Sequence, residues 1–123
     1  MKPILDLDHW IEELRNSEKA IIVEGKNDRK ALEHFGIGRI FILNKPIYAM
    51  VEEVSKSKDV IILTDLDAEG KKLYGSLSSG LRRHGVTIDN RFREFLMKKT
   101  KLRQIEGLVS YSATSEPSSG RRT

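Results

Sequence analysis

The 123 residues can build one domain around a core, and they are too few for two. The chain has no cysteine, which excludes a disulfide framework and thiolate metal sites, and three scattered histidines argue against a zinc site. Any metal is therefore expected to have oxygen ligands. The net charge of +4 is uneven, because residues 91–103 hold six basic side chains against the single acid Glu94. Such a basic margin suits a phosphate polyanion, and a solvated helix face is the alternative.

The N-terminal residues do not resemble a signal peptide. The first apolar residues, Ile4 and Leu5, are interrupted by Asp6 and Asp8. No apolar run approaches the roughly 20 residues of a membrane-spanning helix. We therefore expect a cytoplasmic protein without a membrane segment.

Apolar spacing and turn residues predict helices and strands that alternate along the chain. Helices are predicted over 9–15, 28–35, 46–57, 70–84 and 92–99, the second of them capped by Asn27. Strands are predicted over 19–25, 39–43, 59–64 and 86–89, with a last strand or turn over 104–111. This alternation is typical of an α/β fold with a parallel sheet. We expect an N-terminal helical segment over 1–17 that packs on the domain, the domain itself over 18–111, and a disordered tail over 112–123.

The main candidate for chemistry is the acidic segment that follows the strand ending near Thr64. Asp65, Asp67 and Glu69 stand at alternate positions directly after an apolar run. Three clustered carboxylates raise one another's pKa unless a cation is bound between them. Oxygen ligands alone, with some positions left to water, suit Mg²⁺, and Mn²⁺ is a possible substitute. Solvated acids in a turn are the alternative interpretation.

A second strand end has the same design. The apolar run 20–23 leads into Glu24 and Gly25. Ligands of parallel α/β sheets bind at the carboxyl ends of the strands, so we expect the two acidic loops to meet. Glu24 is then a candidate general acid or base beside the metal.

The two motifs together resemble the Toprim domain. They read Ile22-Val23-Glu24-Gly25-Lys26-Asn27-Asp28 and Leu63-Thr64-Asp65-Leu66-Asp67-Ala68-Glu69-Gly70. This domain is shared by type IA and type II topoisomerases, bacterial primases, OLD-family nucleases and 5S ribosomal RNA maturases. The resemblance covers about residues 18–110. The spelling of the first motif is most similar to the 5S RNA maturases and the stand-alone small primase-like proteins.

The resemblance implies a compact, mostly parallel sheet of about four strands flanked by helices. It also implies that Glu24 is the general acid or base and that Asp65 and Asp67 bind Mg²⁺, with Glu69 as the third acid. Asp28 is a second-tier site candidate on the same basis. We further expect five basic residues to contact the phosphates of RNA or DNA: Lys26, Lys71, Lys72, Arg91 and Arg93.

The chain is too short to carry the tyrosine-bearing domain of a topoisomerase or the zinc module of a primase. Tyr48, Tyr74 and Tyr111 are interpreted as packing residues. One hypothesis is a Mg²⁺-dependent phosphodiesterase, of nuclease or RNA-processing type, in which water is the nucleophile. The alternative is a non-catalytic, metal-containing module that binds nucleic acid or a protein partner within a larger DNA or RNA machine. The sequence leaves open RNA or DNA as substrate, one or two metal ions, and the oligomeric state.

Overall fold

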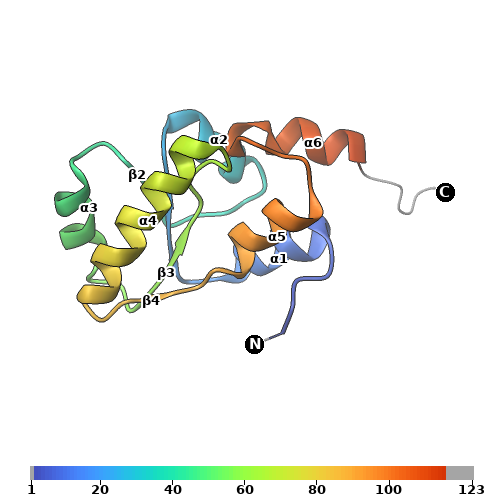
Figure 1. Cartoon of the computed structure of the whole chain (residues 1–123). Coiled ribbons are helices and arrows are strands. Elements are labelled where there is room, and N and C mark those ends of the chain that lie inside the picture. Colours follow the sequence, from blue (N-terminus) through green and yellow to red (C-terminus); the bar gives the residue numbers. More distant parts are fainter. Residues whose placement is uncertain (1, 116–123) are drawn as a thin grey trace.

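Four parallel strands form one sheet in the order β2-β1-β3-β4, in a computed structural model that describes residues 2–115 (Figure 1). The strands are β1 (Ala20–Val23), β2 (Ile40–Ile42), β3 (Asp59–Ile62) and β4 (Thr87–Ile88). The helical elements are α1 (Leu7–Asn16), α2 (Lys26–His34), α3 (Ile47–Val54), α4 (Ala68–Arg83), α5 (Arg91–Lys99), the 3-10 turn η1 (Ile105–Gly107) and α6 (Leu108–Ser115). The predicted α/β class and four-stranded parallel sheet are confirmed.

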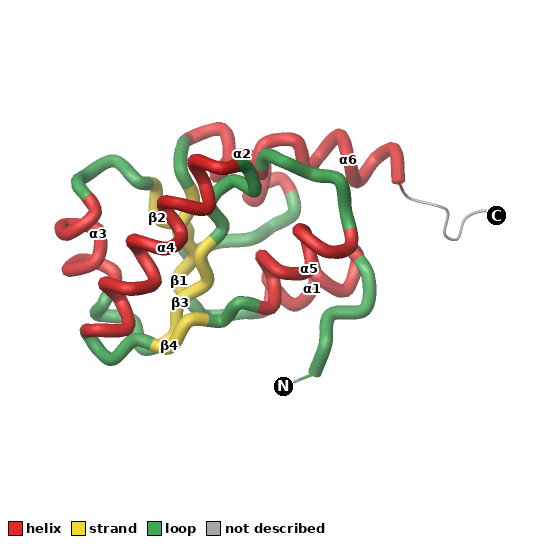
Figure 2. Tube along the Cα trace, in the orientation of Figure 1, coloured by secondary structure: helices red, strands yellow, loops and turns green. Residues whose placement is uncertain are grey.

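The central strands are buried on both faces, and each face packs its own core. Along β1, Ile21 and Val23 contact one cluster of apolar side chains, whereas Ala20 and Ile22 contact the other. This division follows from the two-residue period of a strand. Helices α1, α2 and α5 cover the first face with η1 and α6, and helices α3 and α4 cover the second (Figure 2). The result is a three-layer sandwich in which helices cover both faces of the sheet and loops lie at the ends of the strands.

The N-terminal helix is fixed to the domain through Trp10. Its ring is fully buried and meets the ring of Phe92 edge-on, with the ring centroids 6.0 Å apart. The indole Nε1–H donates a 2.9 Å hydrogen bond to the carbonyl oxygen of Phe92. Buried tryptophan usually finds such a partner for its one polar atom. Helices α1 and α5 are therefore tied together on one face of the sheet.

The C-terminal segment differs from the prediction. Residues 104–111 form η1 and the start of α6, not a strand, because the apolar side chains of Leu102, Ile105, Leu108 and Tyr111 recur every three residues and pack on the first core. Helix α6 continues to Ser115, so the predicted disordered tail does not begin at Ser112. Residues 116–123 of that tail lie outside the described residues.

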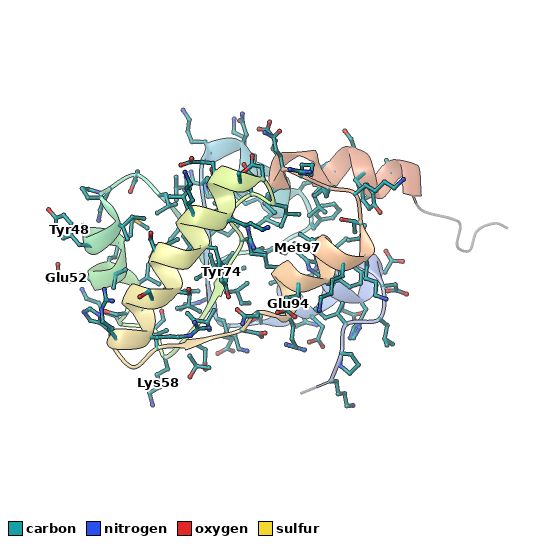
Figure 3. All side chains as sticks on the ribbon, viewed as in Figure 1. Tyr48, Glu52, Lys58, Tyr74, Glu94 and Met97 are labelled. Carbon is teal, nitrogen blue, oxygen red and sulfur yellow. The ribbon has the colours of Figure 1, made fainter. Side chains whose placement is uncertain are left out.

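Two smaller predictions are also wrong. The N-cap of α2 is Gly25, and Asn27 lies inside the helix. Tyr48 does not pack in the core but projects from α3 with 75% of its surface exposed (Figure 3). None of the helices within residues 2–115 combines the length and apolar character that are needed to cross a bilayer.

Candidate functional site

The two motif loops meet at the carboxyl ends of β1 and β3, as expected. These strands are hydrogen-bonded neighbours, with Ile22 opposite Ile62 in the register. Glu24 follows β1, and its Oε2 accepts a 2.8 Å hydrogen bond from the backbone N–H of Asp65. The glutamate of the first motif therefore touches the first aspartate of the second.

A backbone N–H also holds one oxygen of each aspartate. Asp65 Oδ1 accepts a 2.8 Å hydrogen bond from Ile105 N–H, which comes from η1. Asp67 is the N-cap of α4, and its Oδ1 accepts from Gly70 N–H at 2.8 Å. Glu69 lies exposed in the first turn of α4. Asp65 is thus oriented by a segment forty residues away, and Asp67 is oriented by the backbone of its own helix.

Gly70 allows the start of α4 to lie directly against the acidic loop. A Cβ atom at this position would stand 1.8 Å from the carbonyl oxygen of Asp65. The buried Thr64 hydroxyl donates a 2.8 Å hydrogen bond to the carbonyl oxygen of Gly70. The glycine of the motif is therefore explained by close backbone approach.

Arg93 supports the loop that carries Asp65 by hydrogen bonds to its backbone. Its side chain is buried, and its Nη2 and Nε donate to the carbonyl oxygens of Asp65 at 2.7 Å and Thr64 at 3.3 Å. The guanidinium carbon lies 4.9 Å from the ring centroid of Tyr74. Burial lowers the pKa of Arg93, and the nearby charges of Glu24 and Asp65 oppose this shift. The structure does not support the predicted phosphate contact of Arg93.

Arg91 is also engaged inside the protein. Its guanidinium pairs with the buried Asp89 at 3.1 Å and with Glu13 at 3.6 Å, and it donates to the carbonyl oxygen of Lys2 at 3.0 Å. Lys19 completes the surroundings of Asp89 at 2.8 Å. Arg91 therefore joins α1, the N-terminal residues and the end of β4, and the structure does not bring it to the two acidic loops.

The three predicted lysines are exposed, and they lie in the first two turns of α2 and α4. Lys26 begins α2 directly after the Glu24 loop, and it lines the same pocket as Glu24. Lys71 and Lys72 follow Glu69 in α4. Of the five predicted phosphate contacts, Lys26 is the one that lines the pocket beside Glu24.

Asp28 is a buried member of the same site. Its Oδ2 accepts a hydrogen bond from Gly25 N–H at 3.2 Å, so it closes the start of α2 as a capping residue. Burial, followed by the charge of Asp65, raises the pKa of Asp28 to about 6. Burial likewise raises the pKa of Glu24 and of Asp65, and the neighbouring carboxylates add to both shifts.

These groups line a pocket of about 370 Å³, called here the acidic pocket. Its lining residues are Glu24, Gly25, Lys26, Asn27, Asp28, Asp65, Gln104 and Glu106. Gln104 and Glu106 were missed by sequence reasoning, because the 104–111 segment was interpreted as a strand or turn. The apolar spacing of three residues in that segment was the signal for a helical turn that carries both side chains to the site.

The oxygen donors of this site suit a hard cation. Within residues 2–115, no group of three or more His, Asp or Glu side chains is arranged to hold a metal ion by itself. Mg²⁺ does not need such a group, because it commonly binds one or two carboxylates and keeps several waters. Burial is the main cause of the raised pKa of Glu24 and of Asp65, and the neighbouring carboxylates add a repulsion that a cation would relieve. The donor set therefore fits Mg²⁺.

Comparison with known proteins agrees with this geometry. The family model described as the Toprim domain matches residues 19–90, a stretch that contains both motifs and all four strands. The chain belongs to the Toprim domain family. The match ends before α5, so the Arg93 and Ile105 contacts to the acidic loop come from outside the matched part of this Toprim protein.

Similar proteins of about the same size are found in archaea. A UPF0292 protein of Methanocaldococcus jannaschii is 38% identical over 109 residues, covering 82% of this chain and 85% of the relative. A UPF0292 protein of Pyrococcus abyssi is 35% identical over 104 residues, covering 81% of this chain and 79% of the relative. A solved structure of a protein from Aquifex aeolicus superposes with a TM-score of 0.75 at 38% identity, covering 82% of this chain and 96% of that one. The Toprim protein is thus similar to small proteins over most of their length.

Proposed function

We propose that this Toprim protein is a Mg²⁺-dependent phosphodiesterase that acts on nucleic acid. The observation that carries the proposal is the direct contact between the two motifs, in which Glu24 accepts from Asp65 N–H on the wall of the acidic pocket. This contact places a carboxylate of raised pKa beside the candidate metal ligands. Toprim domains are typically Mg²⁺-binding parts of nucleic-acid enzymes, which supports the same conclusion.

Asp65 and Asp67 would hold the metal, with Glu69 beside them. A bound Mg²⁺ would supply Lewis-acid activation of a phosphodiester. Glu24 would take the proton from the attacking water or return it to the leaving oxygen. Its raised pKa favours this role, because a general acid or base works best when its pKa is near the working pH. Lys26, at the rim of the pocket, would position the phosphate.

Cleavage of labelled RNA and DNA in the presence of Mg²⁺ or Mn²⁺ tests this proposal. Glu24→Gln should reduce turnover by about two to four orders of magnitude, the range expected for loss of a general base, and Asp65→Asn should also reduce turnover because it removes a metal ligand. Asp59→Asn is the matched control, because Asp59 is an exposed acid at the other end of β3. Activity that survives both site substitutions in folded protein would refute the assignment, as would equal loss in the control.

The hydrogen bonding of the carboxylates favours a second candidate. One carboxylate oxygen accepts a hydrogen bond from a backbone N–H in each of Glu24, Asp65 and Asp67, as in structural capping residues. A non-catalytic module that binds nucleic acid through this site, within a larger complex with protein partners, would use the same geometry. Metal-dependent binding of nucleic acid without turnover, or a stable protein partner recovered with the inactive domain, would support this candidate against the phosphodiesterase.

A further inference from the structure

Three adjoining depressions surround η1, and Gln104 lines all of them. The first is the acidic pocket. The second, of about 540 Å³, lies between α2 and η1 and is lined by Lys30 and His34. The third, of about 600 Å³, lies beside Asp67 and is lined by Lys101 and Arg103. We refer to the three together as the η1 groove.

Bases line the two depressions that adjoin the acidic pocket, and each of these depressions also has one acid, Glu106 in the second and Asp67 in the third. Lys30 stands on α2 at one end, and Lys101 and Arg103 stand on the loop before η1 at the other. All three side chains are exposed. Within residues 2–115 none of the three is in an ion pair, whereas Arg29 on α2 and Lys98 on α5 are paired with acids of their own helices. The cations at the ends of the groove are thus available to phosphates.

Aromatic rings accompany the cations at both ends. His34 lines the α2 end and is exposed, and its ring stands edge-on to Phe35 with the centroids 4.9 Å apart. Tyr111 of α6 lines the other end and is partly buried against the first core. Single-stranded nucleic acid is commonly bound by a positive groove in which bases stack on aromatic side chains. The η1 groove offers both components on the two sides of the acidic pocket.

The shape of the groove separates a single strand from a duplex. All three depressions meet at Gln104, directly before one turn of 3-10 helix, so a chain that occupied all three would have to curve around that turn. Duplex DNA is stiff, with a persistence length of about 50 nm, and bending it sharply costs several kcal/mol. A single strand follows such a path without that cost.

We propose that the η1 groove binds a single-stranded segment of nucleic acid, whose backbone crosses the acidic pocket between cations at the two ends. The proposal deepens the proposed function and rests on it for the identity of the reacting group, a phosphodiester inside a single strand. Outside the acidic pocket, the groove is lined mainly by residues that neither motif contains, among them Lys30, His34, Lys101, Arg103 and Tyr111.

The test measures binding without turnover. A labelled oligonucleotide of about 12 nucleotides, within the span of known single-strand sites, is titrated in Mg²⁺ with the full chain carrying Glu24→Gln, and binding is followed by fluorescence anisotropy. The variant K101Q/R103Q removes two cations from one end of the groove. The control K56Q/K58Q removes two exposed lysines that line a different pocket, at the starts of the strands (Lys58 in Figure 3). The two variants change the net charge equally.

We expect K101Q/R103Q to weaken binding of the single strand at least tenfold, and the control to change it less than twofold. The slope of log affinity against log salt should fall by about 1.4 in the groove variant, because each lost phosphate contact of a single strand contributes about 0.7. Equal losses in the two variants, or a duplex of the same sequence binding as tightly as the single strand, would overturn the proposal. Because no cleavage is measured, these outcomes are distinct from a failure of the phosphodiesterase assignment.

Discussion

The same substitution at two glycines of α4 should have opposite effects. An alanine Cβ at position 70 would stand 1.8 Å from the carbonyl oxygen of Asp65, whereas at position 75 it would meet nothing within 4 Å. A real Cβ contact is essentially never shorter than 3.0 Å, so Gly70→Ala forces the start of α4 away from the acidic loop. Gly75→Ala requires no movement.

The structure indicates the size of each effect. Moving α4 breaks the hydrogen bond from Thr64 to the Gly70 carbonyl and the cap from Gly70 N–H to Asp67, both 2.8 Å long. Losing a buried hydrogen-bond partner costs about 1–3 kcal/mol and losing a cap about 1 kcal/mol, while the helix propensity of alanine returns about 1 kcal/mol. We therefore expect Gly70→Ala to lower the free energy of unfolding by about 1–3 kcal/mol. Gly75→Ala should raise it by about 0.5–1 kcal/mol.

Urea unfolding followed by circular dichroism measures both variants against the unmodified protein. Mn²⁺ titration of folded Gly70→Ala should in addition show weakened binding. The reason is that the start of α4, which carries Asp67, is displaced from the loop that carries Asp65. The close approach of α4 to Asp65 would be refuted if Gly70→Ala were as stable as the unmodified protein or gained stability as Gly75→Ala does.

Two further substitutions test the supports of the fold. Arg93→Met removes a buried charged donor from two carbonyl oxygens and should lower the free energy of unfolding by about 2–4 kcal/mol. Arg93→Lys should cause a smaller loss than Arg93→Met. A loss below about 0.5 kcal/mol in Arg93→Met would contradict the conclusion that Arg93 supports the acidic loop. Asp89→Asn tests the charge that holds Lys19 and Arg91. Burial raises the pKa of Asp89, but hydrogen bonds from Arg91 and Lys19 outweigh it and leave the pKa lowered. A lowered folded-state pKa stabilises the protein above the unfolded value of about 3.9, and this contribution is lost as pH falls through the folded value. The stability difference between the unmodified protein and Asp89→Asn should accordingly be full at neutral pH and shrink below about pH 4, and a pH-independent difference in unfolding experiments would refute it.

The core of the site could be predicted from the sequence because it depends on short-range patterns. The apolar runs before Glu24 and Asp65 specify buried parallel strands, and parallel strands bring their carboxyl ends to one edge. The contact between Glu24 and Asp65 follows from those two facts. The alternation of helices and strands likewise specified the α/β class.

The supports of the site could not be predicted, because they depend on contacts between distant segments. Arg93 stands in a run of basic residues that is typical of a solvated surface, and its burial becomes apparent only when α5 packs beneath the Asp65 loop. The Ile105 N–H reaches Asp65 from a segment that was predicted as a strand or turn, and nothing in its local pattern indicated that it lies beside Asp65. Local patterns report which face of an element is apolar, and they do not report which polar group lies opposite it.

The hydrogen bonds from Arg93 and Ile105 to Asp65 also bear on how such a site can diverge. Both donors lie beyond residue 90, where the Toprim family match ends. Substitutions in this outer segment can tilt the acidic loop while every motif residue stays the same. Two members with identical motifs can therefore differ in site geometry, and a chimera that exchanges residues 91–107 between relatives would transfer that geometry without changing a motif residue. Engineering or classification based on the motifs alone would miss these differences in site geometry.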